Sequence, residues 1–328
     1  IALNQVRVVP MVVRETGNRQ MPAATLADGR WVTDTTPLIA WLEAQQPAPP
    51  IIPTDPVQRF FNLFVEDYAD EWLWRPAMHF RWWPRAGRMA LSRHLADELC
   101  QGVPMPGFVK RWSVRRRQLG GYVLGDGVTR ANHEQVEATY YENLDWLSAM
   151  LANRDFLMGD SPCLADIGFM GPMFRHFGQD PDPLEIMRQR APRVWQWVTR
   201  MWNCTPANTT GNWLSGIPAD WGPMLDGIGR TYLPYLRANA EAVREGKQRF
   251  SPTVDGVHYV KARVSPYRVW CLQQLRSHYS ALDETSQDEV KKILQRHGCW
   301  DLFWSTPLPE VDVNTDCEPP FGTNATMV

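Results

Sequence analysis

The pattern of hydrophobic and polar residues along this 328-residue chain changes three times. Short apolar runs alternate with turn residues up to about residue 46. After a proline-rich stretch, apolar residues recur at helical spacing. After about residue 204 the pattern mixes loop signals, a hairpin and further helices. We therefore expect a small first unit over residues 1–46, a linker over 47–56, an all-helical domain over 57–203 and a C-terminal extension over 204–328.

The first unit is predicted to be α+β. Residues Val6–Val13 are β-branched and nearly all apolar, which is typical of a strand buried on both faces. Residues 21–26 and 30–33 predict two short strands joined at Asp28-Gly29, a strong hairpin signal. A helix over 38–44 follows, opened by capping residues and a proline just before it.

The second region predicts a long helix over 57–83 at the centre of its domain. Its apolar residues form two stripes, which means burial on two faces. The stripes are Phe60, Phe64, Tyr68 and Trp72, and Phe61, Val65, Ala69 and Leu73. Helical spacing or composition predicts further helices over 108–119, 136–151 and 194–201.

The extension predicts a hairpin that turns at Asp255-Gly256 and two helices, over 266–282 and 286–297. Before the hairpin, a short helical stretch covers 232–245. From Thr306 onward the chain is rich in Pro, Asp, Asn and Thr, and we expect it to lie extended on a surface.

Composition narrows the function classes. The hydrophobic fraction of 44% supports a real core, and the net charge of −2 argues against nucleic acid as the main partner. No apolar run approaches ~18 residues, so no transmembrane helix is expected. The six cysteines are scattered without C-x-x-C pairs, which favours free thiols in a reducing compartment over a metal site. That compartment is the cytoplasm or an organelle matrix, the mitochondrion included, and secretion is not expected. The 16 tryptophans predict a buried interface or cleft.

The order of these elements resembles that of the glutathione transferase superfamily. The residues that carry the resemblance are Gln20-Met21-Pro22, Thr33-Asp34-Thr35-Thr36 and Asp160-Ser161-Pro162-Cys163-Leu164-Ala165-Asp166-Ile167. The resemblance covers roughly residues 1–203. It implies a thioredoxin-like N-terminal domain and an all-helical second domain, to which this chain adds its extension.

The resemblance also implies a glutathione site. In the family the proline that matches Pro22 is cis, and it lets the backbone of Met21 pair with an extended tripeptide. Asp34 and Thr35 match an acidic-hydroxyl pair at a helix start, where backbone N–H groups favour the γ-glutamyl carboxylate. Gln20 matches a position that contacts the glycyl end. The competing interpretation is that Asp34 is only a helix cap and Pro22 only a turn proline. No cofactor is required, and glutathione is the one ligand implied.

Members of the family begin with a strand and a helix that carry the catalytic Tyr, Ser or Cys. Here Ile1–Gln5 is interpreted as the tail of that helix, so we expect a truncated thioredoxin-like domain without its first strand and helix, and no catalytic residue in the chain as given. The open sheet edge would then be covered by another chain or by residues outside this sequence.

These expectations favour a glutathione-transferase-like protein that is catalytically silent and acts as a structural or accessory subunit of a larger assembly, with other subunits or a homodimer partner. The alternative is an active glutathione-dependent transferase, adding the thiolate to an electrophilic hydrophobic substrate, whose catalytic segment lies outside this sequence. A third option is a module that carries glutathione or a hydrophobic ligand without turnover.

Three further features are open to two interpretations. His79 is either a general base beside the cleft or a hydrogen-bonded packing histidine. The basic residues Lys110, Arg111 and Arg115–Arg117 form either a solvated helix face or a surface for an acidic partner or anionic lipid. Asp166 matches the family's helix-capping position. The usual hydroxyl residue of that motif is replaced by Cys163, so that Ser161 is an alternative cap.

Overall fold

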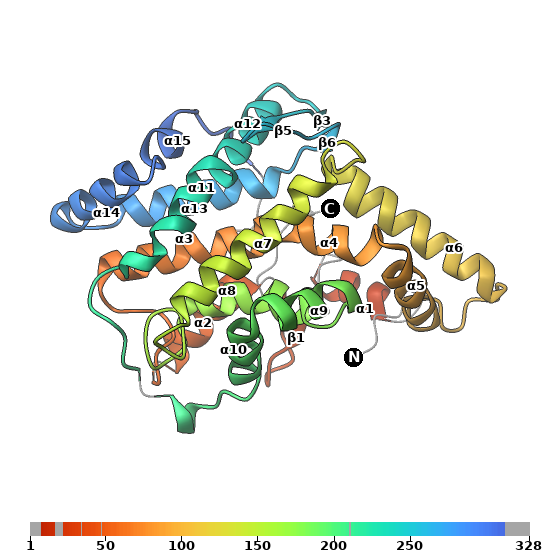
Figure 1. Cartoon of the computed structure of the whole chain (residues 1–328), viewed down its shortest axis with the longest axis horizontal. Coiled ribbons are helices and arrows are strands. Elements are labelled where there is room, and N and C mark those ends of the chain that lie inside the picture. Colours follow the sequence, from red (N-terminus) through yellow and green to blue (C-terminus); the bar gives the residue numbers. More distant parts are fainter. Residues whose placement is uncertain (1–7, 17–21, 34, 47, 210, 312–328) are drawn as a thin grey trace.

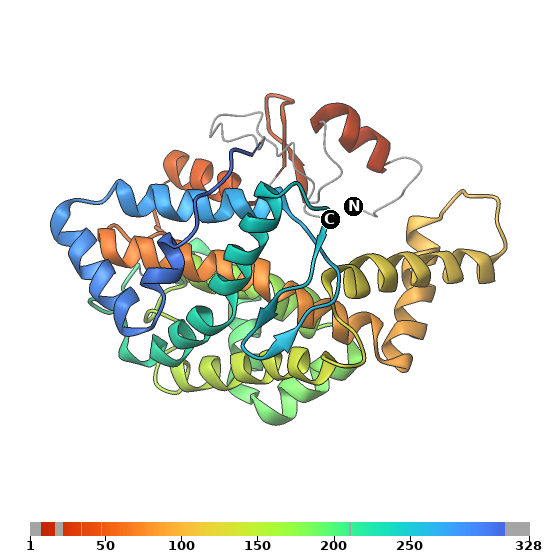
Figure 2. The same cartoon turned by 90° about the horizontal axis from the view of Figure 1, so that it is seen from above.

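The N-terminal part of the chain is small and lies along one side of a large helical body (Figure 2). The computed structural model describes residues 8–16, 22–33, 35–46, 48–209 and 211–311. The N-terminal part consists of helix α1 (Val8–Thr16), strands β1 (Ala23–Thr25) and β2 (Trp31–Thr33), and helix α2 (Thr35–Gln45).

Helices make up most of the rest of the described chain (Figure 1). The helical domain contains α3 (Pro56–Trp72), α4 (Trp74–Trp82), α5 (Arg85–Leu99), α6 (Gly107–Gln118), η1 (Leu119–Val123), η2 (Leu124–Asp126), α7 (His133–Met150), α8 (Leu164–Pro172), η3 (Met173–Phe177), α9 (Pro181–Arg190) and α10 (Pro192–Trp202). The extension contains η4 (Pro206–Asn208), η5 (Ala219–Trp221), α11 (Gly222–Arg230), α12 (Tyr232–Arg244), β3 (Arg249–Phe250), β4 (Thr253–Val254), β5 (Val257–His258), β6 (Ala262–Arg263), α13 (Pro266–Ser280), α14 (Glu284–Arg296) and α15 (Trp300–Trp304).

The strand expected over Val6–Val13 is wrong, because residues Val8–Thr16 form helix α1. Pro10 stands in the first turn of this helix, where its missing N–H breaks no intrahelical hydrogen bond. Val12 is the buried contact of the helix at 2% exposure, and the Thr16 hydroxyl donates to its carbonyl. A run of β-branched residues is only a weak preference for strand, and tertiary contacts override it here.

The hairpin at Asp28-Gly29 is confirmed. β1 and β2 pair antiparallel, with Ala24 opposite Val32, and Gly29 adopts a φ of 85°, which a residue with a Cβ avoids. Among the described residues these two strands form a two-stranded sheet. The truncated thioredoxin-like domain remains a prediction, because its described part consists of this two-stranded sheet and helices α1 and α2.

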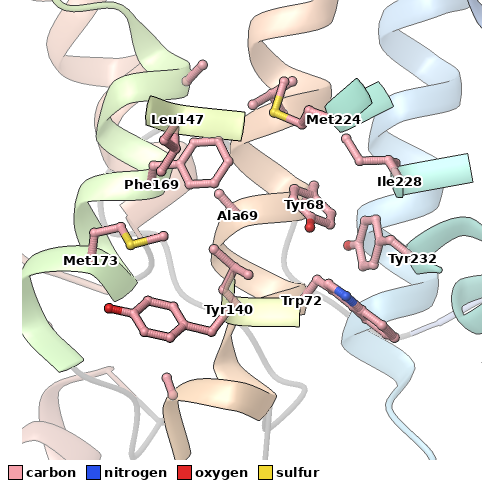
Figure 3. Packing of buried hydrophobic residues seen from close by; sticks show 14 of the residues in the cluster. Tyr68, Ala69, Trp72, Tyr140, Leu147, Phe169, Met173, Met224, Ile228 and Tyr232 are labelled. Atoms are coloured by element: carbon pink, nitrogen blue, oxygen red, sulfur yellow. The ribbon is translucent and has the colours of Figure 1, made fainter. Parts of the chain in front are cut away.

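Helix α3 lies at the centre of the body, as its two apolar stripes predict. All eight stripe residues are at most 2% exposed. Figure 3 shows one side of α3 facing Phe169 and Met173, while Tyr232 and Ile228 of the extension cover the other.

The single helix expected over 57–83 is broken into α3 and α4 at Leu73. Pro76 causes a break at this point, because it has no N–H for the Trp72 carbonyl and its ring clashes with that carbonyl in a continuous helix. At the other end, the Asp55 carboxylate caps α3 by accepting from the Gln58 N–H at 2.9 Å.

Helices α3 and α8 pack closely against each other. A Cβ added at Gly168 of α8 would come within 2.7 Å of the Glu66 Cα, so the two backbones touch through this glycine. Buried Asn62 reinforces the contact, since its side-chain oxygen accepts from the Ala165 N–H at 3.1 Å.

Asp166 caps α8, as its place in the motif predicts. Its buried carboxylate accepts from the backbone N–H of Cys163 at 3.0 Å, from that of Leu157 at 3.1 Å and from the Trp197 indole at 2.8 Å. The Ser161 hydroxyl accepts instead from the Gly211 N–H at 2.7 Å and so ties the start of the extension to the domain.

The extension is integrated into the core. Its hairpin turns at Asp255-Gly256, as expected, and β3 and β6 pair outside it as a second two-stranded ladder. Helix α13 packs on both α12 and α3. The described start of the tail runs along α13, where Gln273 donates to the Pro309 carbonyl and Arg276 to that of Thr306.

The tryptophans are divided between interior and surface. Trp82, Trp197 and Trp221 are at most 1% exposed, whereas Trp112 and Trp202 are 53% and 66% exposed.

None of the described helices combines the length and the apolar character needed to cross a bilayer.

The close contact of α3 and α8 predicts opposite outcomes for two glycines of one helix. Gly168→Ala should lower the free energy of unfolding by about 1–3 kcal/mol, because its methyl group meets the α3 backbone. Gly171→Ala is the control. Its Cβ would have only ordinary contact with Asp70 Oδ1 at 3.8 Å, so it should be neutral or stabilise by up to about 1 kcal/mol. Urea unfolding measures both, and equal effects would contradict the packing described.

Candidate functional site

A hollow lies where helices α2, α3 and α13 meet, and we call it the three-helix pocket. Helix α2 lines it with Thr36, Ile39 and Ala40; α3 with Arg59, Leu63, Glu66, Asp67, Asp70 and Glu71; and α13 with Tyr267, Trp270, Cys271, Gln274, Leu275 and His278. The walls from α2 and α13 are largely apolar, while α3 presents a polar face. The pocket therefore suits an amphipathic small molecule.

The predicted glutathione-binding residues are partly accounted for. Gln20, Met21 and Asp34 lie outside the described residues. Pro22 is exposed just before β1, and Thr35 is the half-buried first residue of α2. The next residue, Thr36, lines the pocket, so the first turn of α2 does reach it. The five-residue site remains a prediction.

The polar side of the pocket is acidic. Glu66, Asp67, Asp70 and Glu71 all line it, because residues three and four apart share one face of α3. We call these four residues the acidic wall. Glu71 Oε2 accepts from Arg268 Nε of α13 at 3.2 Å, and both side chains are 8% exposed. Among the described residues that line the pocket there is one arginine, Arg59, on the same helix as the acidic wall.

The pKa of Asp67, in the acidic wall, is strongly raised. Burial and, to a smaller extent, the like charge of Glu71 raise its pKa to about 7, against the opposing effects of hydrogen bonds from Tyr232 and Cys271 and the charge of Arg268. The Tyr232 hydroxyl donates to Oδ2 at 2.7 Å. The carboxyl group of Asp67 thus changes protonation near neutral pH.

A thiol also stands at this wall. The side chain of Cys271, on α13, hydrogen bonds to the Asp67 carboxyl group. Cys163, Cys204 and Cys299 have pKa values raised chiefly by burial.

The acidic residues of α3 could be recognised in the sequence, but the pocket that they line could not. The pairs at 66–67 and 70–71 have the spacing of a shared helix face, yet the opposite wall comes from α13, about 200 positions later: Arg268 is 197 residues from Glu71. A local pattern carries no signal for such a pairing.

The raised pKa of Asp67 predicts a pH-dependent stability. A carboxyl group whose folded pKa lies above its unfolded value stabilises the fold at low pH, and this contribution is lost as pH rises through about 7. Asp67→Asn keeps an oxygen for Tyr232 but removes the titration. Its unfolding free energy, relative to wild type, should therefore be higher at about pH 8 than at about pH 5. Asp97→Asn, at an exposed carboxyl of α5, is the control, and an equal pH profile for both variants would contradict the assignment.

Comparison with known proteins finds a family match within the helical domain. Residues 122–204 match the family model of the glutathione S-transferase C-terminal domain, and this span includes the Asp166 cap. One similar solved structure is a glutathione S-transferase from Methylobacterium radiotolerans, in complex with glutathione sulfonate. It is 19% identical over 66% of this chain and 82% of its own, and its TM-score of 0.33 is too low to support any comparison of sites. Within the helical domain, residues 122–204 are thus similar to the C-terminal domain of glutathione S-transferases.

Proposed function

We propose that this glutathione-transferase-like protein is catalytically silent toward glutathione and acts as an accessory subunit of a larger assembly. The acidic wall of the three-helix pocket carries the proposal. Transfer chemistry on glutathione requires a thiolate, which neighbouring positive charge or hydrogen-bond donors stabilise. The described lining offers the reverse, with four carboxyl groups on α3 against Arg59.

The direction of this effect follows from electrostatics. Negative charge within a few ångströms of a thiol disfavours its ionisation, and low polarity strengthens the effect. The pKa of Asp67, raised to about 7, reports such surroundings in the pocket itself. A glutathione thiol held against the acidic wall would have its pKa raised rather than lowered.

An exposed hairpin supports the accessory role. Helices α5 and α6 project from the body in both views (Figures 1 and 2). Near its tip, Phe108 and Trp112 are 73% and 53% exposed, and the Arg116 guanidinium lies 5.3 Å from the Trp112 ring centre. Exposed aromatic residues among arginines are typical of protein interfaces, and the positive charge of α6 favours an acidic partner surface.

The cysteines bear on the compartment. The five in the described part of the chain are free thiols, which supports a reducing compartment, the cytoplasm or an organelle matrix such as the mitochondrial one.

One observation favours the alternative function, an active glutathione-dependent transferase. The first turn of α2 reaches the pocket through Thr36, and backbone N–H groups at a helix start suit a carboxylate. The ammonium group of glutathione would then face the acidic wall. In this function Gln20, Met21, Pro22, Asp34 and Thr35 hold the tripeptide.

Turnover separates the two functions. We expect the purified chain to conjugate glutathione to a chloronitrobenzene electrophile no faster than buffer alone, because its pocket does not favour the thiolate. Retention on immobilised glutathione should be weak and the same for wild type and Asp34→Ala. Strong retention that depends on Asp34, together with saturable conjugation, would establish the transferase instead.

The projecting pair of helices α5 and α6 leads to a second prediction. If this helical hairpin docks onto an acidic partner, that partner should copurify with the chain from native cells at a constant ratio. The double variant Phe108→Ser with Trp112→Ser should weaken binding to that partner by at least about 2 kcal/mol. Trp202→Ser, at an equally exposed tryptophan of α10, should leave the complex intact. A chain that purifies alone, or one whose partner is lost only with Trp202→Ser, would contradict this role for the hairpin.

A further inference from the structure

Two histidines and a glutamate meet on the side of the body where α4 and α7 pack together. His79 comes from α4, and His133 and Glu137 come one turn apart from the start of α7. One donor atom from each lies within 4.8 Å of the other two. The His79 ring is fully buried, whereas the side chains of His133 and Glu137 are 27% and 29% exposed. The site therefore lies just beneath the surface on the α7 side, with His133 Nδ1 itself buried and other parts of the His133 and Glu137 side chains reaching solvent.

The contacts among the three residues leave the His133 Nδ1 atom without a hydrogen bond within the described residues. His79 Nε2 lies 2.7 Å from Glu137 Oε1, which identifies His79 as a hydrogen-bonded packing histidine in the absence of any ion. His133 Nδ1 is 3.6 Å from the same oxygen, too far for a hydrogen bond, and has no hydrogen-bond partner within the described residues. A single carboxylate oxygen thus stands between two imidazole nitrogens.

We propose that His79, His133 and Glu137 form a binding site for a divalent transition-metal ion, with Zn²⁺ as the best-matched ion. Two imidazole nitrogens and one carboxylate are a donor set that Zn²⁺ takes at sites with three protein ligands and a fourth position open to water. The set is too rich in nitrogen for Mg²⁺ or Ca²⁺, which prefer oxygen ligands.

The aromatic packing around the two histidines also suits a metal site. The rings of His79 and His133 are nearly parallel, with an interplanar angle of 16°, and Trp83 packs within 6 Å of both ring centres. This packing holds the two imidazoles in place, so little ordering is needed when an ion binds.

Sequence spacing could not reveal this site. His133 and Glu137 have the i, i+4 spacing of a helical metal pair, but His79 lies 58 residues from Glu137. The same His–Glu spacing occurs at His94 and Glu98 of α5, where the side chains are 70% and 41% exposed and no third ligand from the described residues joins them. That pair is a natural control.

Co²⁺ and Zn²⁺ titrations of the chelator-treated full chain test the proposal. We expect one Co²⁺ per chain with the visible absorption of a site of low coordination number, displacement of Co²⁺ by Zn²⁺, and a rise in Tm with Zn²⁺. His133→Gln and Glu137→Gln, at partly exposed positions that leave the core intact, should each weaken binding at least about tenfold. His94→Gln should leave binding unchanged.

Two results would overturn the site. One is the absence of stoichiometric binding at millimolar Zn²⁺ by calorimetry. The other is binding that survives His133→Gln and Glu137→Gln but is lost in His94→Gln. His79→Ala removes a buried ring, so its unfolding curve is compared with that of wild type first. A folded His79→Ala chain that still binds with wild-type affinity would also contradict the proposal.

Discussion

The contact between α3 and α8 at Gly168 is the constraint on which the rest of the structure depends. Because the two backbones touch there, α3 is held in the middle of the body with almost its whole circumference in contact with protein. One face meets α8, another meets the extension, and the remaining edge forms the acidic wall. Helix α4, which continues from α3 after Leu73, carries His79 to α7. The position of α3 thus bears on the pocket directly and on the candidate metal site through α4, which follows it in the chain.

A central helix that carries charged residues needs partners from distant parts of the chain. Glu71 pairs with Arg268 of the extension, and Asp67 with Tyr232. Arg75, which is 2% exposed, lies 4.0 Å from the Tyr235 ring centre and 5.1 Å from that of Tyr259. These contacts compensate in part for the cost of burying charge. They also explain why the extension is part of the core.

The same arrangement links stability to function. The acidic wall is costly to bury, and the raised pKa of Asp67 is one sign of that cost. A pocket that served thiolate chemistry would gain from positive charge at this place. The charge distribution of α3 therefore fits a pocket that holds a ligand or a partner group better than one that ionises a thiol.

Local signals in the sequence predicted the local structure. The Asp28-Gly29 and Asp255-Gly256 turns, the two-faced helix α3 and the Asp166 cap all depend on residues a few positions apart. The helix α1 was missed because its β-branched residues favour a strand, and the break at Leu73 was missed although Pro76 marked it. The pocket and the His79 cluster join residues from 58 to 197 positions apart, and no periodicity records such pairings.

The titration of glutathione in the presence of excess protein tests the central claim most directly. Thiolate absorbance at about 240 nm, followed against pH, gives the pKa of the glutathione thiol, which is about 8.5 for a free thiol. If the acidic wall governs the pocket, the midpoint with protein stays at the value in buffer or moves above it. A midpoint moved toward neutral pH would contradict the account and would show that the chain activates glutathione.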